Sequence, residues 1–162
     1  MKLIKILFLA AFFFTISTIQ VRAGNDTKTF SDFYKNHQHK ESVSLNIPGF
    51  FVRFLLDKED DAKEISKDIK HVKLLIFEGH ASSQKELADE LNQYLPSNLY
   101  NDLMIIKDGA DQVTFKLREK KGKINEIIMI ATDNSSSVIL CIEGNMELSD
   151  VKKLVKSITL MT

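Results

Sequence analysis

The stretch from Asp102 to Glu147 constrains the fold more than any other part of the chain, because it predicts three strands and most of a fourth, separated by tight turns. Glycine, asparagine and aspartate mark these turns, and short hairpin loops select these residues. The turns fall at residues 107–110, 120–122 and 133–136. Strands joined so closely pair in sequence order. We therefore predict a continuous antiparallel meander on which the other elements pack.

Apolar periodicity predicts the elements that precede the meander. They are a short helix over residues 29–37, a strand over 42–47, a helical segment and a strand over 72–77. The helical segment begins at Phe50, is interrupted by the acidic cluster at 57–61, and then resumes through Lys70. Ser83 and Glu86 have capping-box spacing, which predicts that a further helix starts there and ends near Pro96.

A last helix is expected after the meander, capped by Ser149, with Val151, Leu154, Val155 and Ile158 on one face. This order of elements predicts an α+β fold. We expect a two-layer sandwich in which a mixed sheet of about six strands ends in the four-stranded antiparallel meander, with helices mainly on one face. The helical crossover between the first two strands predicts that these two are parallel.

The first 23 residues have the pattern of a secretory signal peptide. Lys2 and Lys5 precede an apolar run over residues 6–19, and the segment ends at Ala23 with small residues. The run is shorter than the roughly 20 residues that a spanning helix needs, so a transmembrane anchor is the weaker alternative. We expect cleavage after Ala23, a single domain over residues 24–162, a periplasmic or secreted location, and no stable membrane anchor after cleavage.

Charge and cysteine content narrow the classes of partner. Loss of Lys2, Lys5 and Arg22 with the signal peptide leaves fewer than 22 basic side chains against 22 acidic ones. This balance does not favour nucleic acid as a partner. Cys141 is the only cysteine, so the chain cannot form an internal disulfide. Its apolar neighbours predict a buried or half-buried side chain rather than a nucleophile.

The turns also predict the pairing of side chains across the meander. The glycine of residues 120–122 fits a three-residue hairpin loop that pairs Glu119 with Lys123. Carried along the strands, this register sets Phe115 opposite Ile127. The turn at Asp108–Gly109 allows two registers, so the face of the residues that precede it stays open.

A two-residue loop at Asn134–Ser135 sets Ala131 opposite Val138, and this second register agrees with the first on one apolar face. We expect helices to cover that face. It comprises Val113, Phe115, Leu117, Ile127, Met129, Ala131, Val138, Leu140 and Ile142.

The other face of the meander, here the outer face, combines a charged ladder with an apolar block. In the ladder Glu126 lies between Lys116 and Glu143. The apolar block consists of Ile128, Ile130, Ile139 and Cys141. A solvated sheet face does not normally expose four such side chains. Either the N-terminal helix or the segment from Phe50 covers them, or a protein partner or a second copy does.

Catalytic and metal sites receive little support from the sequence. Glu126 and Glu143 with Lys116 could form an acid–base pair, but a solvated charge ladder explains the same residues. His37, His39, His71 and His80 lack the spacing of a metal site and are expected to be solvated. The acidic cluster at 57–61 lacks the glycine and final glutamate of a calcium loop. We predict no catalytic residue, no metal and no cofactor.

The meander resembles a known family at Tyr100–Met104, Gly109, Asn125–Met129 and Ile142–Leu148. These runs are similar to the domain of unknown function family numbered 4252, and the resemblance extends over Phe30–Ile158. It implies a small exported or lipid-anchored protein of Bacteroidota in the bacterial envelope, and no established activity. Many members carry a lipidated cysteine where this chain has Ala23–Gly24, which favours a soluble periplasmic protein here.

Two functional hypotheses follow from these observations. The first is a non-enzymatic periplasmic module that binds a protein partner, a second copy or a ligand through the outer face, with Ile128, Ile130, Ile139, Cys141, Lys116, Glu126 and Glu143 as candidate binding residues. The alternative is a hydrolase-type enzyme that uses Glu126, Glu143 and Lys116.

Overall fold

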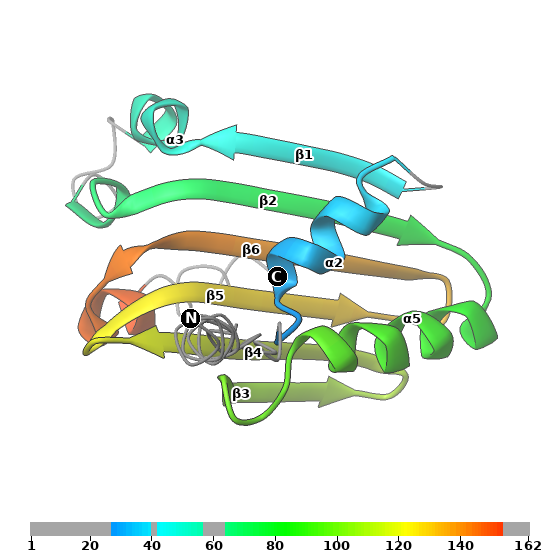
Figure 1. Cartoon of the computed structure of the whole chain (residues 1–162). Helices are drawn as coiled ribbons and strands as arrows, with labels where there is room; N and C mark the ends of the chain where they lie inside the picture. Colours follow the sequence, from blue (N-terminus) through cyan, green and yellow to red (C-terminus); the bar gives the residue numbers. More distant parts are fainter. Residues whose placement is uncertain (1–26, 40–41, 57–63, 154–162) are drawn as a thin grey trace, which may run out of the picture.

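A six-stranded antiparallel sheet dominates the computed structural model, which describes residues 27–39, 42–56 and 64–153. The strands lie in the order β1-β2-β6-β5-β4-β3 (Figure 1). Their bounds are Ser42–Pro48 for β1, Ile69–Glu78 for β2, Tyr100–Asp108 for β3, Asp111–Lys120 for β4, Lys123–Thr132 for β5 and Ser136–Met146 for β6. The helices are α2 (Phe30–His37), α3 (Gly49–Leu56) and α5 (Ala81–Tyr94). The predicted α+β class and the four-stranded meander are confirmed.

The predicted mixed sheet is wrong, because β1 and β2 are antiparallel. Helix α3 has 8 residues and so spans about 12 Å. A helical crossover would have to return along β1, a strand of 7 residues that is about 23 Å long, and α3 alone does not reach that far. Helix α3 instead lies beyond the end of β1 (Figure 1). The chain therefore enters β2 from the same end and runs back beside β1.

The hairpin between β4 and β5 has a shorter loop than predicted. Lys120 pairs with Lys123, and both loop residues are left-handed, with φ of 56° at Lys121 and 73° at Gly122. Positive φ at both positions defines the two-residue loop that matches strand twist. The predicted pairing of Glu119 with Lys123 is wrong, and a bulge follows between Arg118 and Glu119.

The shorter loop and the bulge together move the β4–β5 register by two residues, so Phe115 lies opposite Met129 instead of Ile127. A shift of two leaves every side chain on its predicted face, because side chains alternate along a strand. The other hairpins agree with the sequence or settle what it left open. Ala131 pairs with Val138 as predicted, and β3 places Met104 opposite Phe115.

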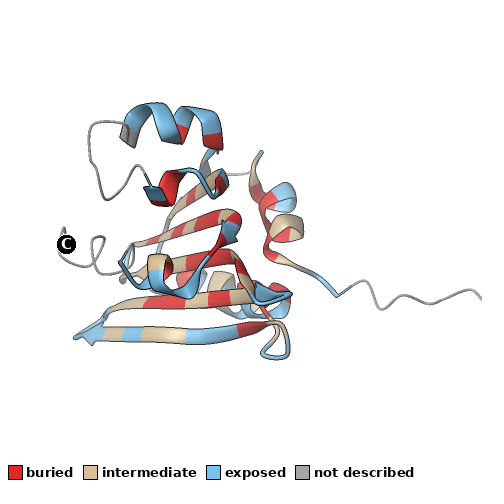
Figure 2. Cartoon of the chain, turned by 90° about the vertical axis from the view of Figure 1, so that its left-hand side faces the viewer, coloured by how far each residue is buried: buried red, intermediate tan, exposed pale blue. Residues whose placement is uncertain are grey.

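Helices α2 and α5 cover the outer face, whereas we expected the helices mainly on the opposite face. Phe30 and Phe33 of α2 and Leu91 of α5 form one core cluster with the apolar block of the outer face. Figure 2 shows α2 on one side of the sheet. The expectation assigned the helices to a face from strand pattern alone. Both faces carry a block of apolar side chains, so the pattern could not exclude helices on either one.

The opposite face forms a second core cluster at the end of the sheet where β1 leads into α3. Val52 of α3, Ile65 of helical residues 64–66, and Val151 of helical residues 148–153 cover it there. Toward the other end of the strands the same face carries half-buried residues such as Met129 and Leu140. The core is thus two clusters, one on each side of the sheet.

Several predicted boundaries differ from the structure. Helix α5 begins at Ala81 with His80 as its N-cap, so the capping box predicted at Ser83 is wrong. The helix predicted through Lys70 is also wrong at its end, because β2 already begins at Ile69. The predicted signal peptide, the acidic cluster at 57–61 and the last helix beyond residue 153 lie outside the described residues.

The β5–β6 turn is held by one carboxylate, and this predicts a pH dependence. Asp133 accepts hydrogen bonds from the amides of Ser135 and Ser136 at 2.6 and 2.7 Å, and from both hydroxyls at 2.8 Å. These bonds, the Ser135 amide first, lower the pKa of Asp133 to about 2. A lowered folded-state pKa stabilises the protein above the unfolded value of about 4, and this contribution is lost as the pH falls toward 2.

We therefore expect Asp133→Asn to lower the free energy of unfolding at neutral pH, with a deficit that narrows between about pH 4 and pH 2. Urea denaturation at a series of pH values measures this. The control Asn134→Ala changes the same turn without removing a carboxylate, so its deficit should not vary with pH. A constant Asp133→Asn deficit would contradict the role of the charge.

Candidate interaction surface

The apolar block predicted as a binding surface is part of the core. Ile128 and Cys141 are 0% exposed and Ile139 is 1% exposed. Ile130 is half-buried against the same cluster, beneath α2 and α5. The sequence left open what covers these side chains. In the structure the chain's own N-terminal helix, α2, covers them. Three of these four side chains are therefore closed to a partner.

The charged ladder is divided among separate ion pairs. Arg118 Nη1 donates to Glu126 Oε1 at 2.8 Å, and Lys73 Nζ donates to Glu143 Oε1 at 2.5 Å. Glu126 and Glu143 are cross-strand neighbours as predicted. The two carboxylates nevertheless have different cationic partners.

Lys116 lies opposite Ile128 rather than Glu126, because the β4–β5 pairing is shifted by two residues from the predicted register. Its Nζ donates to Asp102 at 2.5 Å. Lys116, Glu126 and Glu143 are therefore not brought together as the alternative enzyme hypothesis required.

A buried tyrosine connects this ladder to α2. The Tyr100 hydroxyl donates to Glu126 Oε2 at 2.7 Å and accepts the Phe30 amide proton at 3.2 Å. Tyr100 is 2% exposed, and burial raises the pKa of its hydroxyl well above the usual value. The hydroxyl therefore stays protonated and satisfies one orphan amide at the start of α2. This arrangement fixes α2 on the sheet.

Cys141 and His37 also belong to the interior. Burial raises the pKa of the Cys141 thiol well above its usual value, and the carboxylates of Glu126 and Glu143 add to the effect. A protonated thiol is a poor nucleophile, so the prediction of a small buried hydrophobe is confirmed. The expectation that His37 is solvated is wrong. It is 5% exposed and stacks on Phe33, with 4.1 Å between ring centroids.

Large apolar side chains are exposed together at the β1 end of the sheet. We call this surface the β1–α3 rim. It comprises Val43 and Leu45 of β1, which are 57% and 48% exposed, and Phe50, Phe51, Phe54 and Leu55 of α3, which are 67%, 46%, 75% and 57% exposed. Figure 1 shows that α3 continues from β1 at the same edge of the sheet, and Figure 2 shows the exposed surface of α3. A patch of this kind marks an interaction site more often than a scattered apolar residue does.

The local sequence explains why α3 exposes this surface. The helix reads GFFVRFLL, so apolar side chains surround it on nearly every side. It touches the sheet from one side only, where Val52 is 8% exposed. Gly49 permits this close seating, because a Cβ there would lie 2.1 Å from the carbonyl oxygen of Ile69. The remaining aromatic rings face away from the sheet.

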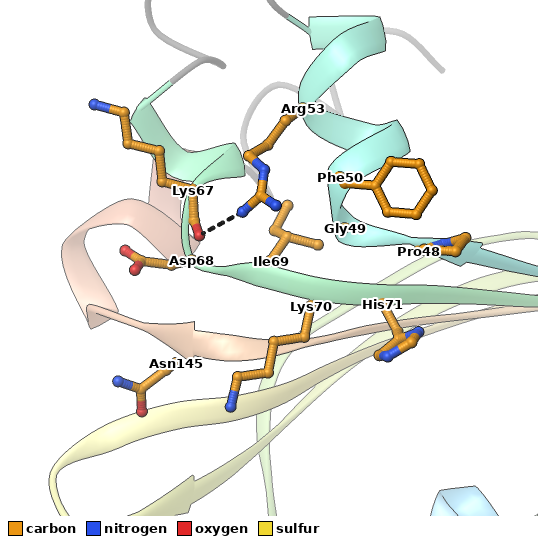
Figure 3. A pocket seen from close by; sticks show the side chains of 10 residues that line it. All are labelled: Pro48, Gly49, Phe50, Arg53, Lys67, Asp68, Ile69, Lys70, His71 and Asn145. Atoms are coloured by element: carbon orange, nitrogen blue, oxygen red, sulfur yellow. Dashed lines mark hydrogen bonds between the residues drawn. The ribbon is translucent and has the colours of Figure 1, made fainter.

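A pocket of about 560 Å³ lies beside the rim, between α3 and the start of β2 (Figure 3). Arg53 reaches across it and donates to the carbonyl oxygen of Lys67 at 3.4 Å. The pocket also contains the cationic side chain of Lys70 and the carboxylate of Asp68. Figure 3 shows Lys67 and Lys70 extending in different directions. The cations therefore give the edge of the rim a positive character without converging on one small anion.

The sequence contains a signal for the rim that the sequence analysis did not recognise as a binding surface. Phe50, Phe51, Phe54 and Leu55 recur at helical spacing, and we interpreted them only as a helical segment that could cover the outer face. A helix of 8 residues cannot bury side chains that surround it on all sides against one sheet.

Among the described residues, no three His, Cys, Asp or Glu side chains gather closely enough to hold a metal ion. No helix in the described ranges is long and apolar enough to cross a membrane.

Comparison with known proteins gives one match. A family model described as "Domain of unknown function (DUF4252)" matches residues 34–154. This range holds every strand and helix named above except the first part of α2. No curated protein and no solved structure matches the chain.

Replacement of Tyr100 tests the link between the ladder and α2. Tyr100→Phe leaves the Phe30 amide without an acceptor and removes the donor to Glu126 Oε2 inside the core, so we expect a loss of about 1–3 kcal/mol of unfolding free energy. Urea denaturation measures the loss, and amide exchange at Phe30 should become faster. Tyr94→Phe is the matched control, because it removes one part-buried bond from Asn36 Nδ2 at 3.1 Å. Equal losses in the two variants would contradict the anchoring role.

Proposed function

The chain belongs to the DUF4252 family, and from this premise we propose that it is an exported, non-enzymatic module that binds a protein partner through the β1–α3 rim. The family description assigns no activity, so the proposal depends on the surface of this chain. One observation carries it, the gathering of six exposed large apolar side chains along β1 and α3.

The chemistry of the rim favours a protein partner. Aromatic side chains are enriched in the centres of protein interfaces and contribute most of the binding free energy there. Phe54 and Phe50 are among the most exposed large hydrophobic residues, and each can fill a pocket on a partner. The pocket below α3 adds Arg53 and two lysines beside these rings. An apolar partner segment flanked by carboxylates would match both features.

Export supports this proposal from the sequence. Lys2 and Lys5 followed by the apolar run that ends before Ala23 have the composition of a signal peptide. A periplasmic or secreted protein without a lipidated cysteine can diffuse to a partner. The earlier hypothesis of a partner-binding module is thus retained, with the surface moved from the outer face to the rim.

Capture from an envelope extract of the native host tests the rim. We expect the wild-type protein to retain a specific partner, identified by mass spectrometry, and Phe50→Ser/Phe54→Ser to retain it at least about tenfold less, as for loss of hot-spot aromatics. Ile105→Ser is the matched control, since Ile105 is a 50% exposed residue on the far edge of the sheet. Circular dichroism should show that all three proteins are folded.

The proposal is contradicted if no captured protein depends on the rim. It is also contradicted if the control reduces capture as much as the double variant does.

Export is tested separately by fractionation of the native host and intact-mass measurement. We expect the protein in the periplasm or the medium, with Gly24 as its first residue. Ala23→Arg should block cleavage, because the peptidase requires a small residue there, and the protein should then keep its leader. Recovery of the uncleaved wild-type chain from the cytosol would contradict the export hypothesis.

A further inference from the structure

The two edges of the sheet are protected very differently against pairing with another strand. Strand β3 carries Asp102, Lys107 and Asp108 and has a register shift between Asp102 and Met104. Charges and bulges of this kind are how proteins protect a sheet edge. Strand β1 reads SVSLNIP, without a charged residue, and its pairing with β2 has no register shift. Among the described strands, β1 is thus the edge that is open to addition of a strand.

The sequence of β1 is complementary to itself in the antiparallel direction. If Leu45 lies opposite Leu45 of a second copy, then Val43 lies opposite Ile47 and Ser44 opposite Asn46. Apolar side chains then meet on one face of the sheet and polar side chains on the other, because side chains alternate along a strand. This register also pairs the strand over its full length of 7 residues.

Apolar surface on the same edge adds to this pairing. On the face of the sheet away from α2 and α5, Leu45 is paired with Leu74, and Val43 with Ile76, so two apolar rows end at the exposed edge. The same rows would continue into a second copy. Helix α3 follows β1 directly, so its rings would lie beside the partner strand's first residues.

The exposed area is close to what a stable dimer needs. The six side chains of the rim expose on the order of 600 Å² of apolar surface per copy, taking about 200 Å² for a full aromatic side chain. A standard interface buries about 800 Å² per partner. The backbone of β1 supplies further area.

We propose that the protein is a two-fold symmetric dimer in which β1 pairs antiparallel with β1 of a second copy, with Leu45 at the axis, to form a continuous twelve-stranded sheet. This inference rests on the proposed function, because it names a second copy of the chain as a partner of the rim. Two-fold dimers are the commonest oligomers and require a self-complementary surface.

Sedimentation of the protein purified from its native host tests the dimer. We expect the wild type to sediment as a dimer. Leu45→Lys places two like charges opposite each other at the axis and should raise the dissociation constant by about 100-fold or more. Ile105→Lys puts the same charge on the β3 edge and should leave the dimer intact. A wild type that stays monomeric at about 100-fold the concentration found in its compartment would overturn the proposal.

Cross-linking tests the register. Residues directly opposite in an antiparallel pair have Cβ atoms about 4.5–5.5 Å apart, which is close enough for a disulfide after a small adjustment. Leu45→Cys should therefore form a covalent dimer under mild oxidation, whereas Ile105→Cys should not. Cys141 is buried, so the wild type provides a low background. A wild-type dimer that neither cross-links through residue 45 nor dissociates in Leu45→Lys would place the interface elsewhere and overturn the β1 pairing.

These outcomes separate the dimer from the proposed function. A monomeric wild type that still captures an envelope protein through Phe50 and Phe54 would remove only the dimer. If Leu45→Lys dissociates the dimer but no captured protein depends on these rings, only the proposed binding of another protein by α3 is contradicted.

Discussion

The pairing of β2 with β6 is the constraint on which the rest of the structure depends. It joins residues that are far apart in sequence, such as Leu75 and Ile139, in adjacent strands. Without it, β1 and β2 would be an isolated hairpin, which is marginally stable in water. With it, the sheet is wide enough to carry a core cluster on each face. It also leaves β1 at one edge and β3 at the other.

The α2/α5 side of the sheet combines apolar packing with a small buried polar network. Tyr100 connects the first amide of α2 to Glu126, and Arg118 balances the charge of that carboxylate. Groups of this kind cost free energy when left unpaired in a core. The network therefore specifies where α2 sits, while the apolar contacts of Phe30 and Phe33 supply most of the driving force.

The asymmetry of the molecule lies at its edges. Charges and a bulge interrupt β3, whereas β1 is uncharged and leads directly into an aromatic helix. Both core clusters lie between helices and the sheet, so neither explains why Phe50 and Phe54 are exposed. An exposed aromatic side chain that neither packs in the core nor interacts favourably with water is most directly explained by a role in binding.

The sequence by itself determined the meander, because glycine and asparagine at tight turns restrict which strands can pair, and side-chain alternation fixed which residues share a face. It did not determine which face the helices cover, since the outer face carries an apolar block around Ile128 beside its charged ladder and the other face is also apolar. It also could not place Lys116 opposite Ile128, because a loop shorter by one residue and a bulge between Arg118 and Glu119 together shift β4 against β5 by two residues. Only the tertiary structure placed α3 beyond the end of β1, so that β1 is antiparallel to β2 and the rim is exposed. It also packed α2 and α5 on the outer face, which buries the predicted apolar block in the core.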